Sequence, residues 1–70
     1  MSIKGIKEAL SKGPVSSQVG KRTITLAKLS GSYHITISEP GRKPMVWQYQ
    51  REKIAIERFE KNVSLLRRSL

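Results

Sequence analysis

Residues 22–38, RTITLAKLSGSYHITIS, alternate apolar and polar side chains on both sides of the pair Ser30-Gly31. β-branched and aromatic residues dominate both halves, which is the pattern of two half-buried β-strands. The Ser-Gly pair fits a two-residue turn, and such a turn fixes which residues lie opposite one another. In that register the apolar side chains of both strands share one face, whereas a shift by one residue would separate them. The predicted pairs are Leu26 with Ile35, Ile24 with Ile37, Ala27 with His34, and Thr25 with Thr36.

A third strand is predicted at residues 45–50, MVWQYQ, after the loop EPGRKP at 39–44. Met45, Trp47 and Tyr49 fall on one side of this strand, and we expect Trp47 to join the apolar face as a core residue. The opposite face of the sheet is polar and is expected to stay in contact with water, as antiparallel sheets allow. Its predicted members are Thr23, Thr25, His34, Thr36, Gln48 and Gln50.

Helical spacing of apolar residues marks both ends of the chain. Residues 51–70 predict an amphipathic helix that covers the apolar face of the sheet. Its stripe consists of Ile56, Phe59, Val63, Leu66 and Leu70. Residues 1–13 predict a shorter helix, ended by Gly13-Pro14, with Ile3, Ile6 and Leu10 on one side. Between this helix and the hairpin, VSSQVG at 15–20 is expected to be a connector.

The elements together predict an α+β fold in the order α-β-β-β-α. A three-stranded antiparallel meander has one face covered by helix. Seventy residues suffice for one core, so we expect a single small domain at residues 1–70. It would comprise a short helix at 1–13, the sheet at 21–50 and a helix at 51–70.

Positive charge is the strongest functional signal in the composition. Fourteen Lys and Arg residues stand against five acidic residues, which gives a formal net charge of +9 and a pI near 10.5. A domain this basic is attracted to polyanions, nucleic acid above all. The chain has no cysteine and one histidine, so we expect no metal ion, cofactor or disulfide. No membrane span or signal peptide is recognisable, and we expect a cytoplasmic protein without a membrane partner.

Several cations are candidates for contacts with nucleic acid. In a meander the first strand begins at the end of the sheet where the second strand ends and the third begins. We therefore expect a cluster there of Lys21, Arg22, Arg42 and Lys43. Two further cations, Lys28 and Arg51, lie toward the other end and are expected to assist. Four clustered cations can neutralise several phosphates, which predicts an affinity that falls with salt.

His34 is the single histidine and a weak candidate for catalysis. A general acid or base needs a carboxylate, a nucleophile or an oxyanion donor beside it. Ser32 and Thr36 are its neighbours on the same face, and the sequence places no glutamate next to it. We therefore expect His34 to be a polar surface residue, on a face that contacts nucleic acid.

Two resemblances bear on function. GSYHI at 31–35 with PGRK at 40–43 resembles the HicA-type toxin ribonucleases, small basic α-β-β-β-α proteins, and implies RNA cleavage by His34. A longer stretch is similar in layout to the positive cofactor four family of transcriptional coactivators. That resemblance implies binding of single-stranded DNA on the sheet and dimerisation through the helix. The matching residues are Lys21 to Ile24, Gly31, Ile35 to Ile37, and Pro40 to Lys43.

The sequence thus predicts a small basic protein that binds nucleic acid through its phosphates, with weak sequence preference and no catalytic activity. One alternative is a protein-interaction module, such as a virus-encoded accessory protein, that forms a homodimer through its helix or an open sheet edge. The other alternative is a HicA-like ribonuclease that uses His34.

Overall fold

The computed structural model describes residues 3–69, with side chains from residue 5 onward. The expected places of the Ile3 side chain and of Leu70 in the two apolar stripes lie outside the described residues. None of the helices in the described part of the chain is long and apolar enough to span a membrane.

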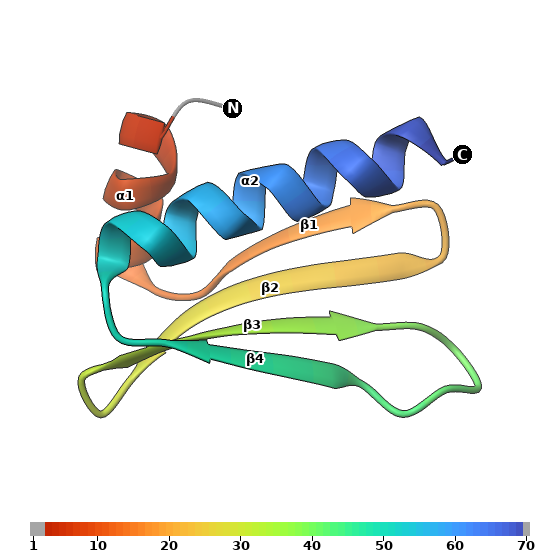
Figure 1. The fold of residues 1–70 in the computed structure, drawn as a ribbon, viewed down its shortest axis with the longest axis horizontal. Helices are drawn as coiled ribbons and strands as arrows, with labels where there is room; N and C mark the ends of the chain where they lie inside the picture. Colours follow the sequence, from red (N-terminus) through yellow and green to blue (C-terminus); the bar gives the residue numbers. More distant parts are fainter. Residues whose placement is uncertain (1–2, 70) are drawn as a thin grey trace.

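Two helices and four strands follow one another along the described chain (Figure 1). They are α1 (Ile3–Lys12), β1 (Val15–Val19), β2 (Arg22–Leu29), β3 (Ser32–Ser38), β4 (Met45–Tyr49) and α2 (Glu52–Arg68). The strands form one antiparallel sheet in the order β1-β2-β3-β4, and both helices pack against the same face of it. The predicted α+β class, with a helix at each end of the chain, is confirmed.

The strand β1 corrects the expectation that residues 15–20 are a connector. Every second side chain of this segment is buried beneath the helices, and those between are exposed. The buried ones are Val15, Ser17 and Val19, so the segment has the two-residue period of a half-buried strand. Gly20 has φ +62° and begins a two-residue turn into β2, where glycine at the first position suits a hairpin. The serines and Gln18 made the segment resemble a loop, although its two valines carry the strand pattern.

The central hairpin has the predicted register. Leu26 pairs with Ile35, Ile24 with Ile37, Ala27 with His34, and Thr25 with Thr36. Ser30 and Gly31 both have positive φ, 49° and 81°, which matches the primed turns that fit the twist of two-residue hairpins. The hairpin prediction is therefore confirmed in both register and turn.

The core lies between the sheet and α2, with α1 closing one side. Phe59 is fully buried at the middle of α2, and Ile6 and Leu10 of α1 join the same cluster. Its other buried members are Val15, Val19, Ile24, Leu26, Tyr33, Ile35, Ala55, Ile56 and Val63. Twelve buried apolar side chains in so short a chain mean that each contributes a large share of the stability.

Trp47 is not the core residue that the sequence predicts. It pairs with Ile35 and so faces the helices, yet it is 39% exposed, and Met45 beside it is 54% exposed. The reason is the placement of α1, which contacts α2, β1 and β2 but, among the described residues, neither β3 nor β4. The flank of α2 above β1 is thus filled by a second helix, whereas the flank above β4 is open.

Candidate nucleic-acid interface

Three segments that are distant in the sequence meet at one end of the molecule. The β1–β2 turn, the β3–β4 loop and the C-terminal end of α2 all lie at the right of Figure 1. The first two segments bring together four of the predicted cations, Lys21, Arg22, Arg42 and Lys43. Two adjoining hollows at this end, of about 320 and 230 Å³, contain all four in their linings.

The end of α2 adds two cations that the sequence analysis did not assign to the site. Leu66 lines both hollows and Ser69 lines one, so the neighbouring Arg67 and Arg68 belong to the same end of the molecule. The position of these two arginines could have been inferred from the sequence. The strand β4 ends at the side of the sheet opposite the cluster, and the following helix of 17 residues, roughly 25 Å long, must run back across the sheet toward it. We call the six residues the basic end: Lys21, Arg22, Arg42, Lys43, Arg67 and Arg68.

Glu39 is the carboxylate at the centre of the basic end. Its Oε2 atom lies 3.6 Å from Nε of Arg22 and 3.8 Å from Nε of Arg42. Both distances exceed that of a good hydrogen bond, so these are loose ion pairs. The side chains of Arg22 and Arg42 remain 41% and 76% exposed, and their guanidinium groups are accessible to an external anion. Six cations against one carboxylate leave five of the chain's nine net charges at this end.

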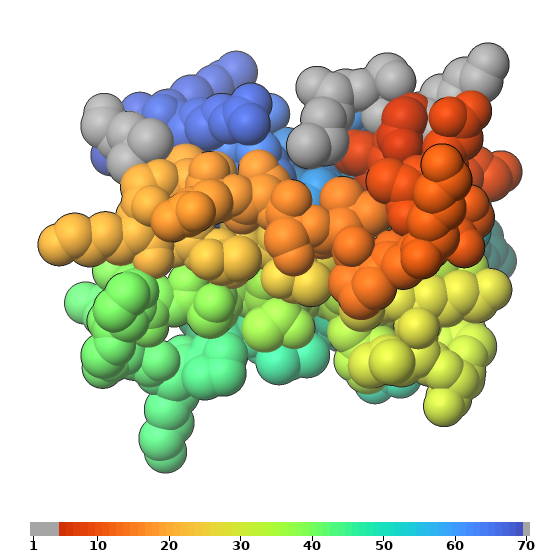
Figure 2. Space-filling view, turned by 180° about the vertical axis from the view of Figure 1, so that it is seen from behind, coloured from red at the N-terminus to blue at the C-terminus, as the bar shows by residue number. Residues whose placement is uncertain are grey.

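The second sheet face is open and uncharged. Figure 2 shows this side of the sheet, with the strands as bands from orange through yellow to green and the helices in the upper part of the view. The strands present threonine, serine and glutamine side chains there, including Thr25, whose hydroxyl is 3.1 Å from that of Ser16. Gln48 donates a 3.0 Å hydrogen bond from Nε2 to Ser32 Oγ. Such a face offers hydrogen bonds, but Tyr33, Trp47 and Tyr49 all turn to the other side, so it offers no phenylalanine, tyrosine or tryptophan ring for base stacking.

His34 lies on this open face between Ala27 and Gln48 and is half-buried. Four of the five glutamates are on the two helices, across the sheet, and Glu39 is at the basic end. Over residues 3–69 no hydrogen bond or ion pair joins a carboxylate to His34. In the same residues no group of three His, Cys, Asp or Glu could hold a metal ion. Among the described residues, the groups nearest to His34 on this face are therefore hydroxyls and amides, and no carboxylate orients its ring.

Lys28 and Arg51 lie at the opposite end of the molecule from the basic end. Lys28 precedes the Ser30-Gly31 turn, and its Nζ is 5.8 Å from the centre of the Tyr33 ring. Arg51 is exposed in the connection from β4 to α2. These two cations, predicted to assist, are thus separated from the cluster by the length of the strands.

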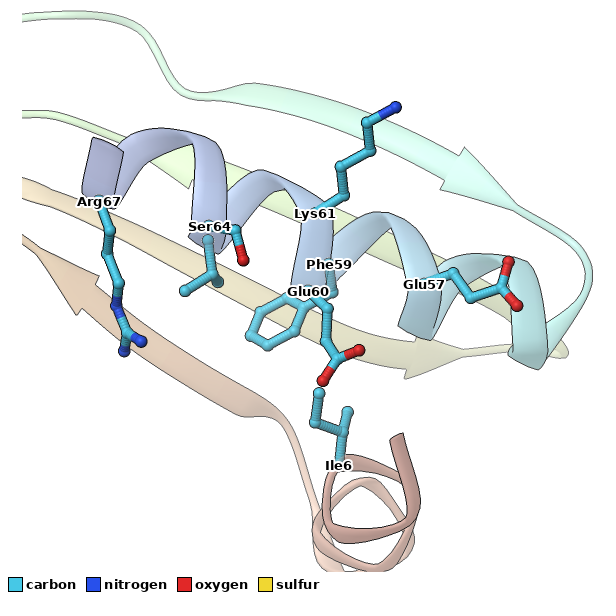
Figure 3. A pocket seen from close by; sticks show the side chains of 8 residues that line it. Ile6, Glu57, Phe59, Glu60, Lys61, Ser64 and Arg67 are labelled. Carbon is cyan, nitrogen blue, oxygen red and sulfur yellow. The ribbon is translucent and has the colours of Figure 1, made fainter. Parts of the chain in front are cut away.

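A further hollow of about 470 Å³ lies between α1 and the second half of α2 (Figure 3). Ile6 and Phe59 form its buried floor. Its charged rim is balanced, since two glutamates, Glu57 and Glu60, accompany Lys61 and Arg67. An anionic partner gains less here than at the basic end, where one sign of charge dominates.

No protein-family model matches this chain, and no curated protein or solved structure is significantly similar to it. The resemblances to positive cofactor four and to the HicA-type ribonucleases remain predictions.

Proposed function

We propose that this protein binds nucleic acid by its phosphates, and that the basic end is the principal contact. The observation that carries the proposal is the convergence of four cations, from the β1–β2 turn and the β3–β4 loop, around two hollows that contain a single glutamate. The end of α2, with Arg67 and Arg68, lies next to them. Cations spread evenly over a surface would serve solubility equally well. Their concentration in one place, around two hollows, is what a polyanion requires.

Arginine and lysine have different parts in this binding. The planar guanidinium groups of Arg22 and Arg42 can each hold two oxygens of one phosphate, whereas Lys21 and Lys43 act as point charges. A phosphate that approaches Arg22 and Arg42 competes with the Glu39 carboxylate, which holds them only loosely. Release of counterions from the nucleic acid supplies much of the driving force.

The open sheet face is the secondary contact in this proposal. Its hydroxyl and amide groups, with His34, are suited to hydrogen bonds with sugars and base edges. Because it has no phenylalanine, tyrosine or tryptophan and its half-buried histidine is a single ring, base stacking favours single strands little on this face. We therefore expect single-stranded and duplex nucleic acids to bind with similar, weak sequence preference.

The test is a fluorescence-polarisation titration with a labelled single strand, duplex DNA and duplex RNA at several salt concentrations. If about four phosphates are neutralised, the logarithm of the affinity for duplex DNA should fall with the logarithm of salt with a slope of roughly −3 to −4. The double variant Arg42→Gln/Lys43→Gln should reduce the steepness of that slope by about 2 and weaken binding at least about tenfold near 0.1 M salt.

The matched control is Lys12→Gln/Lys53→Gln, which removes the same two charges from exposed positions at the opposite end. Weakening by less than about threefold is expected, because the loss of net charge is the same while the basic end is intact. Equal weakening by the two double variants would contradict a localised site. Affinity that does not change with salt would contradict the electrostatic mechanism itself.

A further inference from the structure

The edge strand β4 is exposed on both faces and along its free edge. Met45 and Trp47 on the helix side are 54% and 39% exposed, and Val46 on the open face is 57% exposed. On α2, Ile54 and Leu65 lie three turns apart on one stripe of the helix, with Arg58 and Lys61 between them, and they are 40% and 50% exposed. We call these five residues the β4 patch. Five of the six large apolar side chains that are exposed in the described chain belong to it, the sixth being Leu29.

The strand β4 and its flanking residues are an uncharged part of a strongly charged chain. Residues 44–50, PMVWQYQ, contain no Lys, Arg, Asp or Glu, although 27% of the chain is charged. Soluble proteins usually protect an edge strand with a charge, a proline or a bulge. Here Pro44 stands at one end of the strand, and the five residues of β4 have no such device.

The register shows which backbone groups of β4 are free. Because Ser30-Gly31 is a two-residue turn, Leu29 and Ser32 form a hydrogen-bonded pair, and such pairs alternate along β3. Ile35 is therefore bonded to β4, where its partner is Trp47. It follows that Val46 and Gln48 direct their N–H and C=O groups away from the sheet.

From this geometry we infer that a second copy of this chain pairs with the free edge of β4. A two-fold axis through Trp47 sets Val46 opposite Gln48 of the second copy, so the free backbone groups of both strands are satisfied together. The tryptophans then lie side by side in a non-hydrogen-bonded pair, where side chains come closest. The resulting sheet has eight strands, and the open flanks of the two α2 helices face each other across the centre.

Electrostatics restrict where two copies of this chain can approach. Two molecules with a formal charge of +9 repel each other, and the uncharged segment 44–50 allows their strands to pair with little added repulsion, whereas the α2 flank carries Arg58 and Lys61. Antiparallel pairing places the basic end of one copy beside the Arg51 end of the other. The two basic ends thus lie at opposite extremes of the dimer, and both remain free.

The inference does not rest on nucleic-acid binding, although the two surfaces adjoin: Met45 at the start of β4 also lines one of the hollows at the basic end.

The experiment is sedimentation velocity between 10 and 200 µM in moderate salt, after nucleic acid has been removed, beside the emission of Trp47. Trp47 is the single tryptophan, so its fluorescence reports on the centre of the interface. The wild type should become dimeric over this range, with a blue shift of the emission. Val46→Lys should raise the dissociation constant at least about tenfold, because it places two like charges as diagonal neighbours across the paired edges. Leu29→Lys is the matched control, since Leu29 is also 57% exposed on the open face, and it should dimerise like the wild type.

A gain of function complements this loss. The chain has no cysteine, and Trp47→Cys should form a disulfide-linked dimer under oxidising conditions, whereas Leu29→Cys should not. Circular dichroism verifies that each variant is folded. A wild type that stays monomeric to 200 µM would overturn the inference and leave the edge to a different partner. A dimer that Val46→Lys leaves intact would place the interface elsewhere and would also overturn it.

Discussion

The hydroxyl of Tyr33 donates a hydrogen bond of 3.1 Å to Oε2 of Glu52, the first residue of α2. The other carboxylate oxygen, Oε1, lies 3.7 Å from Nζ of Lys7 on α1. A single carboxylate thus connects β3, α2 and α1 at the end of the molecule opposite the basic end. Glu52 also places negative charge in the first turn of α2, where the helix dipole favours it and where Arg51 supplies no side-chain cap.

Removal of the Tyr33 hydroxyl should destabilise the fold without altering the core. We expect Tyr33→Phe to lower the free energy of unfolding by about 1 kcal/mol, because a hydrogen bond to a partly exposed carboxylate is lost. For a domain of this size the midpoint of thermal unfolding should fall by roughly 4–8 °C. Thermal unfolding followed by circular dichroism measures it.

Tyr49→Phe is the control for this substitution. Tyr49 pairs with Tyr33 on the neighbouring strand and packs against the same core, but the described structure shows no hydrogen bond from its hydroxyl. It should change the unfolding midpoint by no more than about 2 °C. Equal losses from the two substitutions would mean that the Glu52 contact contributes nothing specific.

Glu39 should weaken the binding of nucleic acid at the basic end. We expect Glu39→Gln to strengthen binding to duplex DNA about fivefold, because a negative charge near the bound phosphates, worth about 1 kcal/mol at 4 Å in water, is removed. Arg22 and Arg42 would also lose their internal competitor. Polarisation titrations at constant salt provide the measurement.

Glu57→Gln makes the same change in net charge at an exposed position of α2 away from the basic end. An increase of less than about twofold is expected for it, since its carboxylate is distant from the phosphates. If both glutamine variants bind alike, the arrangement around Glu39 has no special effect and net charge alone explains the gain.

The effect of substitutions in the Ser30-Gly31 turn on stability should depend on how well the new residue adopts a positive φ. Both residues have positive φ, and a Cβ atom at position 31 would meet no other atom within 4 Å. Gly31→Ala should therefore destabilise the protein by about 1 kcal/mol through backbone strain alone. Ser30→Asn should stabilise it by about 0.5 kcal/mol, because asparagine tolerates this conformation well. Urea unfolding measures both, and stabilisation by Gly31→Ala would show that the turn is not of this type.

The sequence predicted an element wherever the alternation or helical spacing of apolar residues extended over enough positions. The hairpin of β2 and β3, the amphipathic helix α2 and the cations at one end of the meander could be predicted, because each depends on local spacing or on simple topology. The strand β1 was missed because five residues with two serines and a glutamine give a weak signal beside a connector. The share of Arg67 and Arg68 in the basic end was missed because it depends on the direction in which α2 returns over the sheet.

By itself the sequence determined which residues alternate, which turn joins β2 to β3, and how strongly the chain is charged. These properties follow from single residues and their near neighbours. Only the tertiary structure decided that α1 covers the β1 side and leaves Trp47 and Met45 of β4 exposed. The exposure of these two side chains depends on where the second helix packs. The sequence pattern shows that a sheet face is apolar, but it does not show which part of that face a helix covers. The fold also brings the cations of the β1–β2 turn and the β3–β4 loop together at one end, next to an edge strand that carries no charge.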